Sequence, residues 1–228
     1  MSDERNRDLI KRFRQQAADR TTVQTMWDAI ERYITPYRGR MFSDQRSEHG
    51  VDLFNSRHIY DSTAVMAHKN LAASIHGSLT SPTMRWFDMR FRSERLNKSK
   101  GAVKWMQAAA DRVHYELQDS NFDLEINKAY QDLAGFGTSL LTLEEGPRGE
   151  WGGLNFTCVP LKEAFFECDH NDQVLRFYRR VQWTPQQILT KFGPKDVPED
   201  IVRLDKDGNT SKIDVLFCIF PRHNKIMK

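Results

Sequence analysis

The stretch "SNFDLEINKAYQDLAGFGTSLLTLEE", Ser120 to Glu145, changes its hydrophobic period part-way along. Its first part places apolar side chains three or four residues apart, the spacing of one helix face. These apolar residues are Phe122, Ile126, Tyr130, Leu133 and Phe136. Ser120, followed three residues later by Asp123, predicts the start of the helix, and Gly137 predicts its end. The alternating "TSLLTLEE" that follows is typical of a strand, so this stretch predicts a helix that leads directly into a strand.

The chain continues with strand patterns beyond this point. A "GPRGEWGG" turn (146–153) and the alternating Leu154, Phe156 and Cys158 predict a hairpin. A second hairpin is predicted from "AFFEC" (164–168) and "QVLRFYRRVQW" (173–183) around the turn "DHND". A last strand is predicted in "KIDVLFCIF" (212–220).

Two short helices are predicted between these strands. Thr184, Pro185 and Gln187 form a capping-box pattern that opens a helix ending at Gly193. A second short helix is predicted near residues 199–204.

The part of the chain before Ser120 is mainly helical in pattern. We expect one helix from Asp8 to Tyr37, a second from Arg57 to Ser78 and a third from Ala102 to Gln118, with an exposed loop over 40–56. The alternation over 86–91 predicts a strand near 85–92.

The second helix carries two patterns of its own. An apolar stripe runs along one face, and small residues on the other face indicate a tightly packed interior helix. The stripe consists of Tyr60, Ala64, Ala67, Leu71, Ile75 and Leu79, and the small residues are Ala72, Ala73, Ser74 and Gly77.

The order of these elements predicts an α+β fold, in which N-terminal helices pack on mostly antiparallel strands and hairpins. We expect a mainly helical part over 1–137 and a β-rich part with short helices over 138–228.

Composition narrows the classes of function. The 228 residues include 34 Lys and Arg against 31 Asp and Glu, a net charge of +3, so bulk charge does not indicate nucleic-acid binding. The three cysteines have no CxxC spacing and predict neither a disulfide framework nor a zinc site. The charged N-terminus lacks a signal-peptide core, and no apolar run is long enough for a membrane helix, so we expect a soluble intracellular protein.

A hydroxyl-rich stretch, "GSLTSPTMRWFDMRF" (77–91), is the first candidate for catalysis. It has no GxSxG motif, and hydroxyls at a helix end ordinarily satisfy open backbone groups. A hydrolase would depend on Ser81, His76 and Asp61, but we expect a structural joint and no catalytic residues.

Metal and nucleotide motifs are also weak. Cys168, Asp169 and His170 lack a second ligand cluster, and "DKDGN" (205–209) departs from the calcium-loop pattern, so both are interpreted as turns. The sequence contains no GxxxxGK[ST] and no GxGxxG motif. We therefore expect no metal and no cofactor.

A basic strand leaves one alternative open. Arg176, Arg179 and Arg180 alternate with Phe177 and other aromatic residues, a composition that contacts phosphates or stacks on bases. A nucleic-acid-binding module that uses residues 176–183 is the alternative function, against a solvated strand face.

Five segments in order carry a more specific signal: "WDAIERYITPYRGRMF" (27–42), "IYDSTAVMAHKNLAASIHGSLTSPTMRWFDMRF" (59–91), "SNF" (120–122), "DLAGFGTSLLTLEE" (132–145) and "TPQQILTKFG" (184–193). With these segments the chain resembles the N-terminal part of podovirus-type, T7-like portal proteins, the head-to-tail connectors of short-tailed phages. The residues that carry the resemblance are Trp27, Pro36, Asp61, Asn70, Leu79, Thr80, Ser81, Pro82, Trp86, Phe87, Ser120, Asn121, Phe122, Phe136 and Gly137.

The resemblance implies a structural protein and not an enzyme. The expected fold is part of the portal wing. The expected assembly is a homo-oligomeric ring of 12 subunits at the capsid vertex of the virion, assembled in the host bacterial cytoplasm. The expected partners are the terminase motor, scaffold, capsid and tail proteins and the double-stranded DNA that passes through the channel, with no membrane. Because such portals are more than twice as long, we expect an N-terminal fragment that lacks stem, clip and crown.

Overall fold

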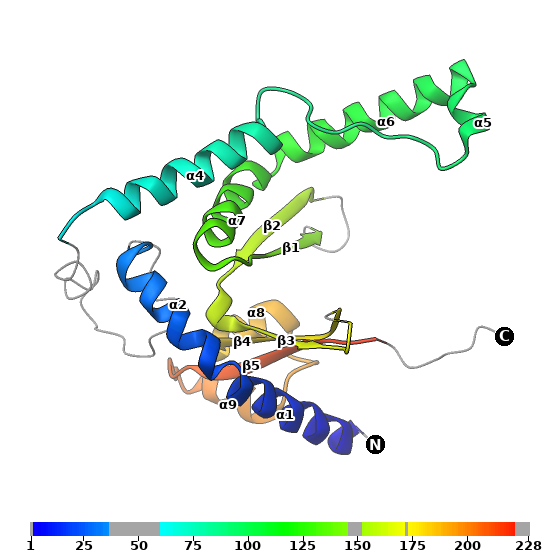
Figure 1. The fold of residues 1–228 in the computed structure, drawn as a ribbon. Coiled ribbons are helices and arrows are strands. Elements are labelled where there is room, and N and C mark those ends of the chain that lie inside the picture. The colour runs from blue at the N-terminus through cyan, green and yellow to red at the C-terminus, as the bar shows by residue number, and fades with distance from the viewer. Residues whose placement is uncertain (1, 37–59, 146–151, 172, 222–228) are drawn as a thin grey trace. The chain divides into compact units, whose positions relative to one another are not determined.

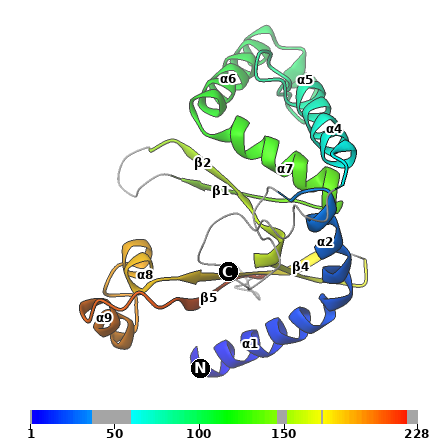
Figure 2. The same ribbon diagram turned by 90° about the vertical axis from the view of Figure 1, so that its left-hand side faces the viewer.

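The computed structural model describes residues 2–36, 60–145, 152–171 and 173–221 (Figures 1 and 2). The chain forms two compact units, each with its own internal packing. Unit 1 combines Met1–Thr22 with Lys162–Lys228, and unit 2 is the continuous stretch Val23–Leu161. The expected loop over 40–56 lies outside the described residues.

Unit 2 is a helical assembly on one hairpin. Its helices are α2 (Thr21–Tyr33, which begins in unit 1), α4 (Thr63–Leu79), α5 (Glu94–Asn97), α6 (Lys100–Asp119) and α7 (Phe122–Phe136). Its strands β1 (Leu140–Glu145) and β2 (Leu154–Val159) pair antiparallel, with Leu140 opposite Val159. The predicted hairpin after Gly137 is therefore confirmed.

Helix α7 lies at the centre of unit 2, between α4 and the hairpin (Figures 1 and 2). The close approach of α4 is visible at Gly135, where an added Cβ would lie 3.2 Å from His68 Nε2. His68 is buried, and its Nε2 lies 2.8 Å from the Gln131 carbonyl oxygen. A polar side chain therefore joins the two helices within their packed interface.

A small hydrophobic cluster closes the end of α7. Trp27 packs edge-on against Phe136, with ring centroids 6.4 Å apart, and Leu161 and Ile30 complete the cluster. Gly137 follows with φ 76°, and its N–H donates to the Leu133 carbonyl at 3.0 Å. The left-handed conformation favours glycine, so the predicted helix end is confirmed.

Unit 1 is a three-stranded sheet with helices on both faces. Its strands β3 (Ala164–Cys168), β4 (Val174–Trp183) and β5 (Ile213–Ile219) pair antiparallel in the order β3-β4-β5. The 3-10 turn η1 (Leu161–Glu163) precedes β3. Helix α1 (Ser2–Asp19) packs on one face, where the Phe13 ring lies 4.8 Å from Phe165.

Helix α8 (Pro185–Phe192) packs on the other face of this sheet near Trp183 and is followed by α9 (Glu199–Lys206). Phe192 and Trp183 both contact Phe217, with centroid distances of 6.0 and 5.4 Å. The predicted capping box of α8 is present, because Thr184 N donates to Gln187 Oε1 at 3.0 Å and Gln187 N donates to Thr184 Oγ1 at 3.4 Å.

The α+β class and the antiparallel hairpins are confirmed. The division expected after residue 137 was based on secondary structure, between a helix-rich and a strand-rich part. The two compact units are defined by packing, and their boundaries lie after residues 22 and 161.

The single helix expected from Asp8 to Tyr37 is wrong, because α1 and α2 are separated at Arg20. The Arg20 guanidinium donates to the carbonyls of Lys162 (3.1 Å) and Ala164 (2.8 Å) and lies 3.8 Å from the Phe165 ring. These partners are more than 140 residues away in sequence, so the helical period gives no sign of the break.

The strand expected near 85–92 is also wrong, since residues 85–91 pair with no strand in the described part of the chain. Burial does alternate, with Phe87, Met89 and Phe91 turned inward. They face a helix: Phe87 contacts His114 and Phe91 stacks on Trp105 of α6, at 6.2 and 6.1 Å between centroids. An alternation of apolar and polar residues indicates that one side of an extended segment is buried. It does not indicate whether a strand or a helix covers that side.

The expectation that α4 is buried along its small residues is wrong for all but one of them. Ala72 is 1% exposed, but Ala73, Ser74 and Gly77 are exposed. The predicted apolar stripe is exposed except at the half-buried Ile75. The buried side instead runs through Val65, His68 and Ala72, because His68 finds its polar partner on α7.

Candidate functional site

The "SNF" turn, Ser120 to Phe122, joins α6 to α7, and each of its residues has a separate contact. Ser120 Oγ donates to the Leu117 carbonyl at 2.7 Å and accepts from Phe122 N at 3.1 Å. The helix begins one residue later than predicted, with Asn121 at the cap position and no side-chain cap bond. Ser120 therefore closes the turn between the helices instead of capping α7.

Asn121 connects the turn to strand β2. Its Nδ2 donates to the Phe156 carbonyl at 2.8 Å, and its Oδ1 accepts from Phe156 N at 2.8 Å. One turn further along α7, Glu125 Oε2 accepts from Cys158 N at 2.8 Å. Since Phe156 and Cys158 are two residues apart, both bonds lie on the edge of β2 that faces away from β1. Side chains of α7 thus occupy the edge where a third strand would pair.

The third residue of the turn, Phe122, lies between two other aromatic rings. Trp86 stacks on it with centroids 6.1 Å apart and planes at 13°, and Phe156 meets it edge-on at 5.1 Å. Phe87 packs against Trp86 at 4.9 Å. This junction, Ser120–Phe122 with Trp86, Phe87 and Phe156, brings together α6, α7, β2 and the segment after α4.

The exit from α4 is held by the same helices. The buried Thr80 donates from its backbone N–H to the His76 carbonyl (3.0 Å) and from Oγ1 to Tyr130 Oη (3.2 Å). The Pro82 carbonyl accepts from Gln118 Nε2 at 3.3 Å. The hydroxyl-rich stretch is therefore a structural joint at these positions.

The remaining residues of the resemblance lie at different places in unit 2. Phe136 and Gly137 form the end of α7 described above, and Trp27 of α2 packs against Phe136. Asp61 Oδ1 accepts from Thr63 N and Oγ1, at 3.0 and 2.8 Å, just before α4. The pKa of Asp61 lies below its ordinary value because the Thr63 hydroxyl and N–H stabilise the carboxylate. Leu79 and Asn70 are exposed and Pro36 is half-buried.

The candidate catalytic residues do not assemble into a triad. Ser81 Oγ contacts Thr83 Oγ1 at 3.0 Å, whereas His76 Nε2 lies 2.9 Å from Asp123 Oδ1. Asp61 precedes α4 and Ser81 follows it. A 17-residue helix between them is about 25 Å long. No nucleophile and base among these three are within hydrogen-bond reach.

The cysteines occupy three different environments. Cys158 is buried and its Sγ donates to Asp132 Oδ2 at 3.4 Å, Cys168 is exposed and Cys218 is half-buried. Burial raises the pKa of the Cys218 thiol. Within the described residues no three His, Cys, Asp or Glu side chains lie close enough to hold a metal ion.

Both suspected ligand loops are turns. In the first, Asp169 Oδ1 accepts from Asn171 N and Gln173 N at 2.8 and 3.0 Å. In the second, Gly208 has φ 67° and Asn209 Oδ1 accepts from Ser211 N at 2.7 Å. The side-chain oxygens therefore bond to nearby backbone groups.

The basic strand β4 carries paired charges. Arg176 Nη1 lies 2.5 Å from Glu167, Arg179 Nε lies 3.1 Å from Glu163, and Arg180 Nη2 lies 3.0 Å from Asp214. Phosphate contact at these arginines remains a prediction, and the three carboxylates oppose it because a nucleic acid would have to displace them.

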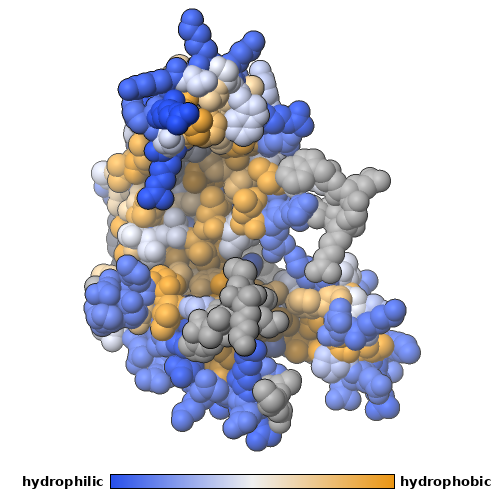
Figure 3. Space-filling view, turned by 90° about the vertical axis from the view of Figure 1, so that its right-hand side faces the viewer, coloured by the Kyte–Doolittle hydropathy of each residue, from blue (hydrophilic) through white to orange (hydrophobic). Residues whose placement is uncertain are grey.

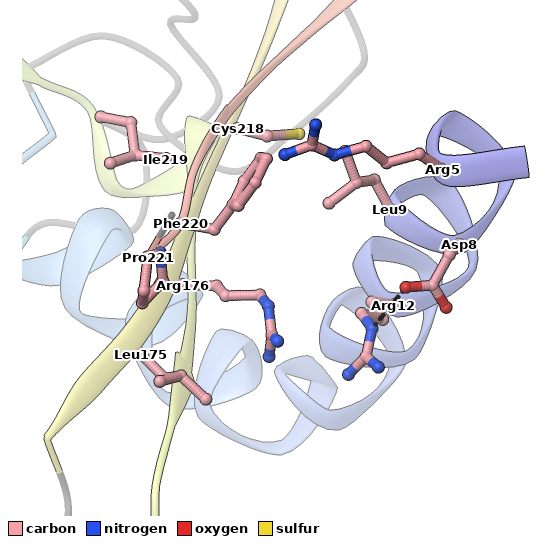
Figure 4. Close-up of a pocket in the computed structure, with 10 residues that line it drawn as sticks. All are labelled: Arg5, Asp8, Leu9, Arg12, Leu175, Arg176, Cys218, Ile219, Phe220 and Pro221. Carbon is pink, nitrogen blue, oxygen red and sulfur yellow. Dashed lines mark hydrogen bonds and ion pairs between the residues drawn. The ribbon is translucent and has the colours of Figure 1, made fainter. Parts of the chain in front are cut away.

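A groove of about 1060 Å³ lies between α1 and the β4–β5 face inside unit 1 (Figure 4). Arg12 bonds to Asp8 at 2.9 Å, and the Arg5 guanidinium lies 4.8 Å from the Phe220 ring. Figure 4 shows the apolar Leu9 and Phe220 beside Arg5, whereas Leu175 lies on the strand side of the groove near Arg176. The lining carboxylate, Asp8, is bonded to Arg12. The lining residues are Arg5, Asp8, Leu9, Arg12, Leu175, Arg176, Cys218, Ile219, Phe220 and Pro221.

Comparison with known proteins matches residues 6–228 to one family, described as bacteriophage head to tail connecting protein. The chain belongs to this family. It is similar to the probable portal protein of Bordetella phage BPP-1, with 25% identity over 219 residues, and to the portal protein of Salmonella phage epsilon15, with 22% identity over 227 residues. These matches cover 95% and 99% of the chain but only 38% and 40% of the two relatives. The resemblance drawn from the sequence is thereby confirmed.

Sequence reasoning missed two features of unit 2. One is the polar side chains that bind backbone groups, such as Asn121 and Asn97, because their partners are set by tertiary structure. The other is a dense run of cations over 90–104. This run of cations can be read directly from the sequence, but it was overlooked because only the total charge of the chain was considered. None of the described helices is long and apolar enough to cross a bilayer.

Proposed function

We propose that this chain is the wing region of a phage portal subunit, part of a ring at the capsid vertex through which DNA is packaged and ejected. The observation that carries the proposal is the family match over residues 6–228, supported by similarity to two portal proteins along almost the whole chain. In this proposal the subunit acts by assembly and makes or breaks no covalent bond.

The construction of unit 2 supports a structural role. The residues of the resemblance at the junction bond to backbone groups and to one another: Asn121 binds Phe156, and Thr80 binds Tyr130. Residues selected for chemistry would instead converge on a cavity with a nucleophile and a base. The shared motifs therefore fix the geometry of a rigid part.

The surface of unit 2 supports assembly. Large apolar side chains remain exposed on α4, α6 and α7, for example Leu71 (52%), Trp105 (63%) and Leu124 (61%). Exposed apolar surface of this kind is typical of contact sites. In a cyclic ring each subunit offers two different patches to its two neighbours, so contact surfaces are needed on more than one side.

The resemblance supplies the finer partners of the proposal. They are eleven further copies in a 12-subunit ring, the terminase motor, scaffold, capsid and tail proteins, and double-stranded DNA in the channel. The location follows as the virion vertex after assembly in the host cytoplasm. An independent nucleic-acid-binding module is not proposed, because Arg176, Arg179 and Arg180 are all ion-paired.

The test is to express the complete reading frame that contains this chain and to examine it by negative-stain electron microscopy. Rings with a central hole are expected. Ser81→Ala is the matched control, because it removes the candidate nucleophile and should leave ring formation unchanged. Monomers or small globular oligomers at every protein concentration would contradict the proposal.

A further inference from the structure

Six cations gather at one end of unit 2, around α5 and the start of α6. We call Arg90, Arg92, Arg95, Lys98, Lys100 and Lys104 the basic extension. All six side chains are exposed, and none forms an ion pair with a described residue. Long hydrophilic side chains project over this end of the unit in Figure 3. They differ in this respect from Arg176, Arg179 and Arg180, which all have carboxylate partners.

The charge of the chain is concentrated here. Residues 90–104 contain six cations and one carboxylate, Glu94, which is a net charge of +5. Because the whole chain has a net charge of +3, all other residues together carry −2. The first turn of α6 contains no acidic residue to offset Lys100. The basic extension is therefore a strongly positive segment of a chain whose other residues sum to a small negative charge.

The backbone that carries the cations is held in place. Asn97 Oδ1 accepts from Phe91 N at 3.0 Å, and Asn97 Nδ2 donates to the Phe91 carbonyl at 2.9 Å. The Phe91 ring stacks on Trp105 with planes at 23°. Arg90 and Arg92, on either side of Phe91, are both turned outward. The two guanidiniums are thus presented from a fixed segment on the same side.

This chemistry fits a ligand with closely spaced negative charges. Guanidinium groups bind phosphate oxygens through two parallel hydrogen bonds, and lysines bind them as point charges. Interfaces with DNA are much more positively charged than interfaces between proteins. If the partner were a protein, the six cations would lie at the centre of the interface, where charged residues are ordinarily depleted.

We propose that the basic extension binds the phosphate backbone of double-stranded DNA without reading its sequence. The choice of DNA among polyanions rests on the proposed function, in which the assembled ring handles a DNA genome. No described side chain of the extension has a competing carboxylate, so each can release a counterion from the duplex on contact. The rest of the chain, with net charge −2, contributes no general attraction.

The experiment uses the complete protein and a short fluorescent DNA duplex, with anisotropy measured at several salt concentrations. If all six cations contact phosphates, affinity falls on the order of 10³-fold between 50 and 200 mM salt. The test variant is Arg90→Gln/Arg92→Gln/Lys100→Gln, which removes three of the contacts. Its affinity is expected to fall only about 40-fold over the same range.

The control is Lys195→Gln/Arg203→Gln/Lys206→Gln, which removes three exposed cations that have no ion pair in the described residues of unit 1. Both triple variants change the net charge by the same amount. Weaker binding and a shallower salt dependence in the test variant alone would support the site. Equal losses in both variants, or no loss in either, would overturn it.

Two further measurements separate the other outcomes. If a poly-glutamate peptide binds and the test variant loses this binding, while DNA does not bind the parent, the extension is a site for an acidic protein and the proposal is overturned. Ring formation by the same variants is followed by electron microscopy. Rings without DNA binding would refute the DNA site alone, whereas DNA binding without rings would refute the proposed portal function.

Discussion

The side-chain amide of Asn121 occupies both backbone hydrogen-bonding groups of Phe156, with two bonds of 2.8 Å. An asparagine at the first turn of α7 thus takes the place that a neighbouring strand would have beside β2. Because Phe156 is buried, neither of its groups has water as an alternative partner. The "SNF" motif is therefore explained by the fixed relation of one helix to one strand edge.

Removing this amide should destabilise the protein. Asn121→Ala leaves the Phe156 N–H and carbonyl unpaired, and we expect the free energy of unfolding to fall by about 2–4 kcal/mol. Urea denaturation measures the change. Asn155→Ala is the control, because the exposed Asn155 makes only a 3.1 Å bond to Asn121, and a change below about 0.5 kcal/mol is expected. Equal losses in both variants would contradict this role of Asn121.

Helices and strands with a regular hydrophobic period were predicted correctly from the sequence. The predictions were wrong where contacts with residues distant in sequence determine the local structure. The helix and strand around Gly137 and the α8 capping box follow from local rules, and the structure contains them. The break at Arg20 depends on carbonyls near residue 162. The segment 85–91 has the alternation of a strand, but a helix covers its inner side. The predicted joint at Thr80 to Pro82 was correct, whereas the burial of α4 was predicted from residue size and missed the polar His68.

Two neighbouring hydroxyls in the joint after α4 should differ in their effect on stability. Thr80→Val removes the buried donor to Tyr130 Oη, and we expect a loss of about 1 kcal/mol. Ser81→Ala removes a contact with the exposed Thr83 and should change stability by less than about 0.5 kcal/mol. Thermal unfolding of both variants measures the two losses of stability. A larger loss for Ser81→Ala than for Thr80→Val would contradict the assignment of the stabilising hydrogen bond to Thr80.

The three cysteines should react with iodoacetamide in a fixed order. Cys168 is exposed and reacts first. Cys218 reacts more slowly, because burial raises the pKa of its thiol and lowers the fraction of reactive thiolate near neutral pH. The buried Cys158 should react only when the protein unfolds. Mass spectrometry of peptides after timed labelling measures the order, and early modification of Cys158 would contradict the packing of β2 on α7.

Asp214 should contribute a stabilisation that acid removes. Burial acts to raise its pKa, but hydrogen bonds from Arg180 and Gln182 and the Arg180 charge outweigh burial, so the pKa lies below the ordinary value of 3.8. A carboxylate with a lowered pKa in the folded state stabilises the fold above pH 3.8, and this stabilisation is lost as the pH falls further. Asp214→Asn should therefore lower the unfolding midpoint at pH about 7, with the difference from the parent shrinking toward pH about 2.

The control for this pH dependence is Asp196→Asn, which removes an exposed carboxylate without an ion pair in the described residues. It changes the net charge equally, and its difference from the parent should show little dependence on pH. A parallel pH dependence in both variants would attribute the effect to net charge and not to the Arg180 pair.

Two adjacent alanines on α4 give the sharpest test of which face of this helix is buried. Ala72 is 1% exposed and faces the α7 side, so Ala72→Phe should overpack the interface and cost about 1–3 kcal/mol or prevent folding. Ala73 is exposed, so Ala73→Phe should leave the free energy of unfolding within about 0.5 kcal/mol of that of the parent. Because both substitutions replace alanine with phenylalanine in the same helix, the change in helix propensity is the same for the two variants.

If Ala73→Phe is as destabilising as Ala72→Phe, the small-residue face of α4 is buried within the subunit after all. If Ala73→Phe unfolds like the parent but forms fewer rings, the exposed face of α4 is a contact between subunits.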